Sequence, residues 1–183
     1  MRKAFIGLAG LALVAACSKA PANVASSAES AGASATPASA AATPAAAVSG
    51  PAVSGTFTVD GKAATLIQVT AHKDDPFDGQ PVTALVFTAK DQNGDAKAAT
   101  NALFGNYGDA IVARVEPDGT VIGADVVHSG LKEQGSVSIS GAFTIKNFKS
   151  SGGVISGELT TGGPNDVFDQ KLDADLTFHT AAP

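Results

Sequence analysis

Aromatic residues, cysteine and clustered positive charge are all scarce in this chain of 183 residues. It has no tryptophan, one tyrosine (Tyr107) and one cysteine (Cys17), and aromatic residues make up 5% of it. A single cysteine excludes a disulfide within the chain, so the fold must be stabilised by its hydrophobic core. The shortage of Trp and Tyr argues against a carbohydrate-cleaving cleft, which relies on aromatic platforms and an apolar pocket around one acid.

The charge balance is acidic, with a formal net charge of −5 at pH 7 and no run of Lys or Arg. An acidic surface repels nucleic-acid phosphates, so we expect no nucleic-acid partner. The same repulsion disfavours adhesion to anionic lipid headgroups. Any attachment to a membrane is therefore expected to be covalent.

The first residues combine positive charge with a short apolar run. Arg2 and Lys3 precede residues 4–16, which carry no charge. This run is too short for a transmembrane helix, which needs about 20 apolar residues. Its length and flanks instead predict a secretory signal peptide over residues 1–16.

The end of this run resembles the lipobox of bacterial lipoproteins, which has an aliphatic residue, two small residues and then a cysteine. The matching residues are Val14, Ala15, Ala16 and Cys17. The resemblance implies cleavage after Ala16, a diacylglycerol thioether on Cys17 and an acyl chain such as palmitate on the new amino group, and such multiple chains anchor stably. In this family an Asp after the cysteine favours retention at the inner membrane. Ser18 at that position implies the periplasmic face of the outer membrane.

Residues 17–52 follow as a lipidated cysteine and a low-complexity segment. From residue 19 onward the segment is almost entirely Ala, Ser, Pro, Thr and Gly, and four prolines are spaced along it. No apolar face repeats at helical spacing, so the composition predicts a disordered tether. We expect the tether to serve as a flexible spacer that gives the β domain reach from its lipid anchor.

Residues 53–183 show the alternation typical of β-strands. Leu172, Ala174, Leu176 and Phe178 occupy every second position. The clearest such run places Val137, Ile139, Gly141, Phe143 and Ile145 on one face of a single predicted strand.

Turn residues bound the other predicted elements. Asp60-Gly61 is a tight turn, and Pro117-Asp118-Gly119 joins a hairpin. Strands are predicted at residues 56–59, 63–72, 82–89, 111–115, 121–128 and 154–160. Residues 82–87 are apolar on both faces, which places that strand centrally. Asp95 is expected to cap a helix over residues 96–104, with Gly105 just past its end.

About eight strands and one short helix predict an all-β domain after a disordered tether. Without helices to cover a parallel sheet, the strands should form an antiparallel sandwich or a barrel-like sheet. The domain is similar in style to small β-rich domains that follow lipoprotein signals in Gram-negative bacteria. The segments that carry the likeness are residues 55–62 and 156–161. This resemblance implies no activity.

No constellation of reactive residues stands out. The three histidines, at positions 72, 128 and 179, lie near strand ends without a local metal-binding pair. Residues 91–95 are interpreted as a turn and a helix cap rather than a calcium loop. We therefore predict no catalytic, cofactor-binding or metal-binding residues.

One short acidic segment is the candidate partner-contact loop. Asp74, Asp75 and Asp78 surround Pro76 and Phe77. The interpretation without a functional role is a solvated loop between strands. Phe77 is either tucked against the sheet as an anchor or presented to a partner.

The sequence predicts a lipid-anchored, non-enzymatic domain that binds a protein partner in the cell envelope. The alternative is a carrier of a small apolar ligand inside a β-barrel. Large inward side chains would fill such an interior, whereas small ones such as Ala84, Gly141 and Ala174 would leave a cavity. An enzyme is the least favoured of the three classes.

Overall fold

Eleven strands and one short helix make up the described part of the chain, which is residues 53–133 and 135–183 of a computed structural model. The predicted signal peptide, Cys17 and the tether lie outside the described residues. Within the described ranges, no helix has the length and apolar composition needed to cross a membrane.

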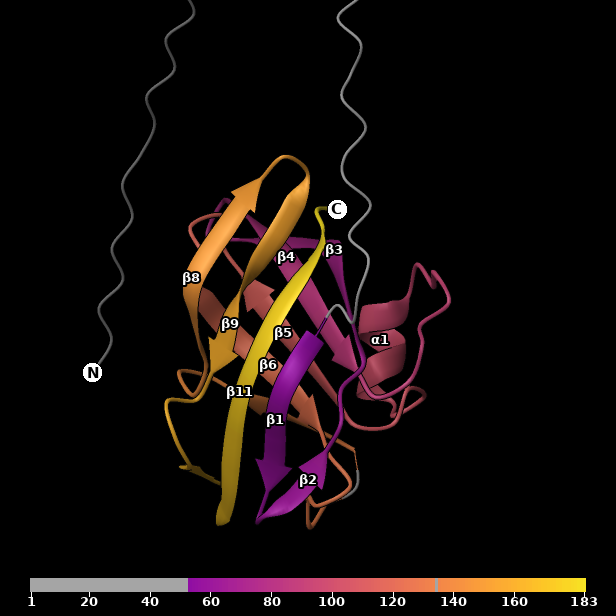
Figure 1. Cartoon of the computed structure of the whole chain (residues 1–183), viewed down its shortest axis with the longest axis vertical. Coiled ribbons are helices and arrows are strands. Elements are labelled where there is room, and N and C mark those ends of the chain that lie inside the picture. Colours follow the sequence, from indigo (N-terminus) through magenta and orange to yellow (C-terminus); the bar gives the residue numbers. More distant parts are fainter. Residues whose placement is uncertain (1–52, 134) are drawn as a thin grey trace, which may run out of the picture. The chain divides into compact units, whose positions relative to one another are not determined.

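The strands form two antiparallel sheets, which lie one in front of the other in Figure 1. Sheet A has the order β2-β1-β11-β9-β8, and β10 also pairs with β11. Its strands are β1 (Val53–Val59), β2 (Lys62–Ala64), β8 (Thr144–Ser151), β9 (Val154–Thr160), β10 (Asn165–Val167) and β11 (Gln170–Ala181). Sheet B has the order β3-β4-β5-β6-β7. Its strands are β3 (Gln68–Phe77), β4 (Gln80–Thr88), β5 (Ala110–Val115), β6 (Val121–Val127) and β7 (Ser136–Ile139).

The two sheets differ in how the chain builds them. Sheet B is a meander, in which each strand pairs with the next along the sequence. Sheet A combines both ends of the domain, because β1 pairs with β11 from Val53↔Phe178 to Val59↔Leu172. The chain therefore crosses from sheet A to sheet B after β2 and returns after β7.

Both crossings interrupt strands that the sequence predicted as continuous. The predicted strand over residues 63–72 is β2 followed by β3, and the one from Val137 to Ile145 is β7 followed by β8. Gly141, with φ of +75°, lies in the second crossing. Alternation of burial continues through the second crossing, where Val137, Ile139 and Phe143 share one side, but it shifts by one residue at the first, between Leu66 and Val69. These two breaks, together with the short β10, raise the strand number from the expected eight to eleven.

The inward faces of the two sheets pack into one core, so the domain is a sandwich and not a barrel. Phe57, Phe87 and Phe178 are almost fully buried there. Phe87 of sheet B meets Phe178 of sheet A edge to face, with ring centroids 5.3 Å apart. Large side chains fill the interior. Ala84, which was expected to point inward, instead belongs to the outer face of sheet B.

The helix α1 (Ala98–Leu103) covers that outer face (Figure 1). Ala98 and Ala102 are fully buried against a cluster that includes Ala84, Val86 and Val112. Because α1 hides the second face, β4 is buried on both faces, as its continuous apolar run predicted. The helix is shorter than the predicted span of residues 96–104.

Several local predictions are confirmed. The Pro117-Asp118-Gly119 turn joins β5 to β6, and Asp118 accepts a hydrogen bond from the Thr120 amide at 2.8 Å. Asp60 and Gly61 form the β1–β2 turn, both with positive φ. Leu172, Ala174, Leu176 and Phe178 are all buried on one face of β11.

Candidate functional site: a cleft at one end of the sandwich

The acidic segment singled out in the sequence is a strand end rather than a loop. Asp74 and Asp75 belong to β3 with Phe77, and only Asp78 and Gly79 form the turn to β4. Their φ angles of +48° and +76° suit a two-residue hairpin turn. The pairing shifts register between Asp74 and Phe77, which lets Pro76 sit in an edge strand without costing a ladder hydrogen bond.

Phe77 projects from the tip of this hairpin. Its side chain is 57% exposed, so it is not tucked against the sheet as an anchor. Asp75 and Asp78 are exposed beside it. The tip therefore presents one aromatic ring flanked by two carboxylates.

Asp74 has a different environment from the other two carboxylates. It accepts a hydrogen bond from Arg114 Nε at 3.1 Å, and Arg114 Nη1 donates to Asp125 at 2.7 Å. Ser138 donates to the other oxygen of Asp125. Burial alone would lower the pKa of Arg114, but the two carboxylates outweigh it and raise the pKa above its ordinary value. These contacts run across sheet B from β3 to β7 and connect the base of the hairpin with the strands at the other edge of the sheet.

A cleft of about 370 Å³ opens beside this hairpin at the end of the sandwich. Its lining includes Leu85, Val115, Phe148 and Ile155, which come from both sheets. Turn and hairpin residues add three proline rings, those of Pro76, Pro81 and Pro117. The lining is thus mainly apolar, and its volume lies in the range of small-molecule sites, which is about 300–1,000 Å³.

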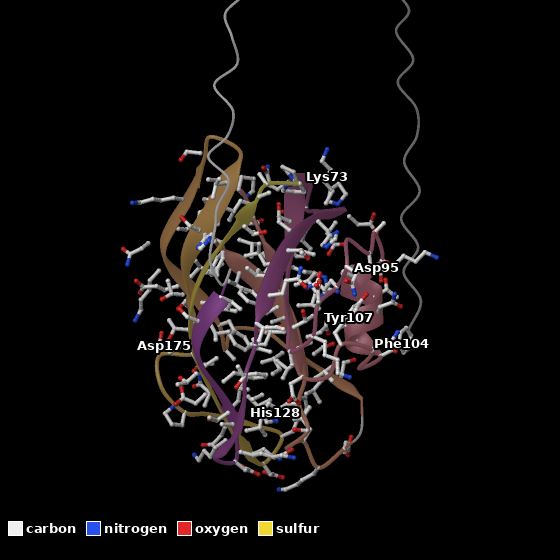
Figure 2. All side chains as sticks on the ribbon, turned by 45° about the vertical axis from the view of Figure 1, so that its right-hand side comes forward. Lys73, Asp95, Phe104, Tyr107, His128 and Asp175 are labelled. Carbon is white, nitrogen blue, oxygen red and sulfur yellow. The ribbon has the colours of Figure 1, made fainter. Side chains whose placement is uncertain are left out.

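Lys73 lines the cleft and lies at the end of the domain opposite His128 (Figure 2). By strand alternation it shares the inward face of β3 with the core residue Val69. Its side chain is exposed, and the cleft also contains Glu116 of the β5–β6 turn. The lining therefore carries charges of both signs, Lys73 against Asp74 and Glu116, beside its apolar residues.

Close packing of one turn shapes the cleft wall. A Cβ at Gly119 would lie 2.6 Å from the ring of Phe148, so only glycine lets the β5–β6 turn approach β8 this closely. At the C-terminal end, the Ala182 amide donates to Gly153 O at 2.8 Å, which brings Ala182 and Pro183 to the rim.

Sequence reasoning located the hairpin but not the cleft. The lining residues come from segments that are distant in the sequence, and nothing in their local pattern marks Phe148 or Ile155 as neighbours of Pro76. The one available signal was the position of Pro76, Pro81 and Pro117 at or beside predicted turns.

A second polar cluster ties α1 to the loops before and after it. Asp95 accepts hydrogen bonds from Tyr107 at 2.5 Å, from the Lys97 amide and from Asn101. The Tyr107 bond, followed by those from Lys97 and Asn101, lowers the pKa of Asp95 to about 2. Asp95 therefore does not cap the helix, whose N-cap is Lys97, but organises the loop before it. Asp95 and Tyr107 lie side by side in Figure 2.

The histidines do not converge. His72 lies on β3, His179 on β11 and His128 just after β6, at the end of the domain opposite Lys73 (Figure 2). His179 lies near the end of β11 as expected, whereas His72 lies in the middle of β3 and His128 is only 4% exposed and is not a surface residue. Across residues 53–133 and 135–183, no three His, Cys, Asp or Glu side chains gather into a possible metal site.

Fold and site together define an antiparallel β-sandwich with a helix on one sheet and an apolar cleft at one end. The chain matches no protein-family model, and the searches of curated proteins and of solved structures gave no match.

Proposed function

We propose that this chain is a lipid-anchored, non-enzymatic binding domain of the cell envelope that acts on a protein partner. The observation that carries the proposal is the apolar cleft beside a hairpin tip that exposes Phe77 between two carboxylates. A partner would insert an apolar side chain into the cleft. Basic residues around that side chain would meet Asp75 and Asp78.

Burial of Phe77 against a partner is energetically more favourable than its exposure to water. Phe77 has more than half of its surface in water, although burying a Phe side chain is worth about 1.5–3 kcal/mol. Aromatic anchors surrounded by polar groups dominate many protein interfaces. The carboxylates add orientation and speed of encounter with a basic partner more than affinity.

Site-specific photocrosslinking in cells tests this proposal. A photoreactive residue at position 77 should give a discrete adduct, and the double change Asp75→Asn with Asp78→Asn should reduce its yield. Position 104 is the matched control, because Phe104 is even more exposed (77%) and belongs to the α1 end of the domain. No adduct at position 77, or equal adducts at both positions, would contradict the proposal.

A carrier of a small apolar ligand is the second candidate, and the apolar lining of the cleft favours it. Because the core is filled, we propose that such a ligand would bind in the cleft. Thr83 lines the cleft and is half-buried, so Thr83→Phe should fill it. An alkyl-chain fluorophore that binds the purified chain and is excluded by Thr83→Phe would support the carrier function. Binding unaffected by Thr83→Phe would oppose it.

The anchor rests on the lipobox resemblance of residues 14–17. Cys17→Ser should leave an uncleaved precursor without lipid, because serine cannot form the thioether. Metabolic labelling with a fatty acid and membrane fractionation check this outcome. A serine variant that still matures and fractionates with the outer membrane would show that the anchor is wrongly assigned.

A further inference from the structure

The turn between β10 and β11 places an unsuitable residue in a strained position. Phe168 and Asp169 form the two-residue connection and have φ angles of +49° and +57°. Such turns favour Asn and Gly, because a bulky side chain is strained at positive φ. Phe168 is also 68% exposed. It suits neither the backbone conformation nor the solvent, and strain of this kind is concentrated at functional sites.

Two hollows adjoin this phenylalanine. They have volumes of about 430 and about 570 Å³, and both are lined by Phe168 and by Ser138 of β7. The first extends along residues 138–142 and β10, and the second reaches Leu131 and Gln170. Together they follow the whole length of β7 on the side of β10. We call this space the β7 seam.

The β7 seam has unpaired strand edges along it. Among the described residues, strand β7, the last of sheet B, pairs only with β6, and β10 pairs only with β11. In an antiparallel edge strand, alternate residues direct their backbone N–H and C=O groups away from the partner strand. An extended chain segment supplies the matching donors and acceptors.

The side chains around the β7 seam favour an uncharged segment. Lys171 pairs with Asp166 at 2.6 Å, and Lys132 Nζ donates to Asp169 O at 3.0 Å. The two lysines are thus engaged, and Glu133 and Asp169 add carboxylates, so the rim carries both signs and does not select a segment of one strong charge. Small residues along β7 and the turn after it let another backbone approach; these are Ser136, Ser138, Ser140, Gly141 and Ala142.

We propose that the β7 seam binds an extended, uncharged segment of a protein partner, which adds to sheet B as a strand beside β7 while Phe168 packs on one of its apolar side chains. This surface is separate from the cleft and does not depend on the function proposed for it. Strand addition supplies affinity through the main chain, and Phe168 adds preference for an apolar residue.

The probe is a small set of capped heptapeptides, Ser-X-Thr-Z-Thr-X-Ser, in which X is Val or Ile and Z is Leu, Phe or Tyr. Binding to the purified chain is followed through backbone amide shifts of residues 136–140. Each peptide is compared with two N-methylated forms, methylated at alternate residues on one edge or on the other. Methylation on the edge that faces β7 should weaken binding at least tenfold, because donors are lost and acceptors are left unpaired. Methylation on the other edge should change it less than twofold.

The variant Phe168→Asn separates binding from a structural role. Asparagine suits positive φ, so the variant should melt a few degrees higher than the unchanged chain while binding the peptides at least tenfold more weakly. Phe104→Asn, at an exposed site on the α1 side, should leave peptide binding unchanged. The proposal is overturned if no peptide shifts these amides at millimolar concentration, if both methylation patterns bind alike, or if Phe168→Asn binds normally. A lower melting temperature for Phe168→Asn would overturn the role given to Phe168.

Discussion

Strand β11 of sheet A and strand β4 of sheet B are both internal strands, yet their burial differs. Along β11, buried and accessible residues alternate almost without exception. Along β4, the last five residues are all buried, from Ala84 to Thr88. Both strands place one face in the same core, so the difference arises on their outer faces.

The outer face of sheet B is covered by α1, and the outer face of β11 meets solvent. Small residues make this cover possible, because Ala98 and Ala102 let α1 approach Ala84 and Val86 closely. One short helix thus converts part of a two-layer sandwich into three layers. A continuous apolar run in a strand of an antiparallel sheet thus indicates that another element packs on the second face of that strand.

Substituting one outer-face residue in each sheet should show most clearly that the two outer faces differ in burial. Val112→Asn places an amide beneath α1 at a position that is 1% exposed, whereas Thr177→Asn places it on the exposed face of β11. We expect Val112→Asn to lower the free energy of unfolding by about 3–6 kcal/mol, through lost valine burial and an unpaired amide. Thr177→Asn should change it by about 0.5 kcal/mol or less. Urea unfolding of both variants measures the contrast, and equal losses would mean that β11 is covered too.

The shared core should also be sensitive to truncation, in contrast to the solvent face beside it. Phe143 follows the crossing from sheet B to sheet A and is 3% exposed, while its neighbour Thr144 is exposed. Phe143→Ala should cost about 3–5 kcal/mol, because transfer energy is lost and a cavity remains. Thr144→Ala should stay within about 0.5 kcal/mol. Denaturant unfolding of the two variants measures this difference in the free energy of unfolding. A silent Phe143→Ala would show that the side chain does not belong to the core.

Local patterns predicted individual strands and turns better than the division into sheets. The alternation of Leu172 to Phe178 and the turn at Pro117-Asp118-Gly119 required only neighbouring residues, so both were predictable. The crossings at residues 65–67 and 140–143 were not, because no local signal marks the point at which the pairing partner changes. Which strand pairs with which depends on contacts far apart in the sequence.

The candidate site was predictable only in part, for the same reason. The acidic hairpin stood out by composition, although its strand character did not. Exposure of Phe77 and Phe168 and the apolar cleft depend on how the two sheets stop at their ends. The cover over sheet B was also missed as a layer, because α1 has only six residues and an unremarkable alanine-rich sequence.

The smallest expected effect concerns His128, which follows sheet B and contacts sheet A. Its ring, which follows β6 of sheet B, packs edge to face on Phe57 of sheet A at 4.7 Å, and Nδ1 accepts a hydrogen bond from the Gly130 amide at 2.8 Å. Burial lowers the pKa of His128 below its ordinary value, and nearby Lys62 lowers it further, against an opposing effect of Asp109. The folded state therefore keeps the ring neutral at a pH where the unfolded chain, with an ordinary pKa of about 6.5, already binds a proton.

The unfolded state thus binds more protons as the pH falls through about 6.5, so stability should decrease towards acid, by at most about 1.4 kcal/mol per pH unit for this one group. Above that range the contribution is fully present. The variant His128→Asn should reduce the slope of unfolding free energy between pH 5 and pH 7 relative to the unchanged chain. Val53→Ala, a core truncation in sheet A, should lower stability at every pH but keep the slope. If His128→Asn retains the full slope, the ring is not held neutral where it contacts sheet A, and the contact between the sheets is more open to water there than its burial indicates.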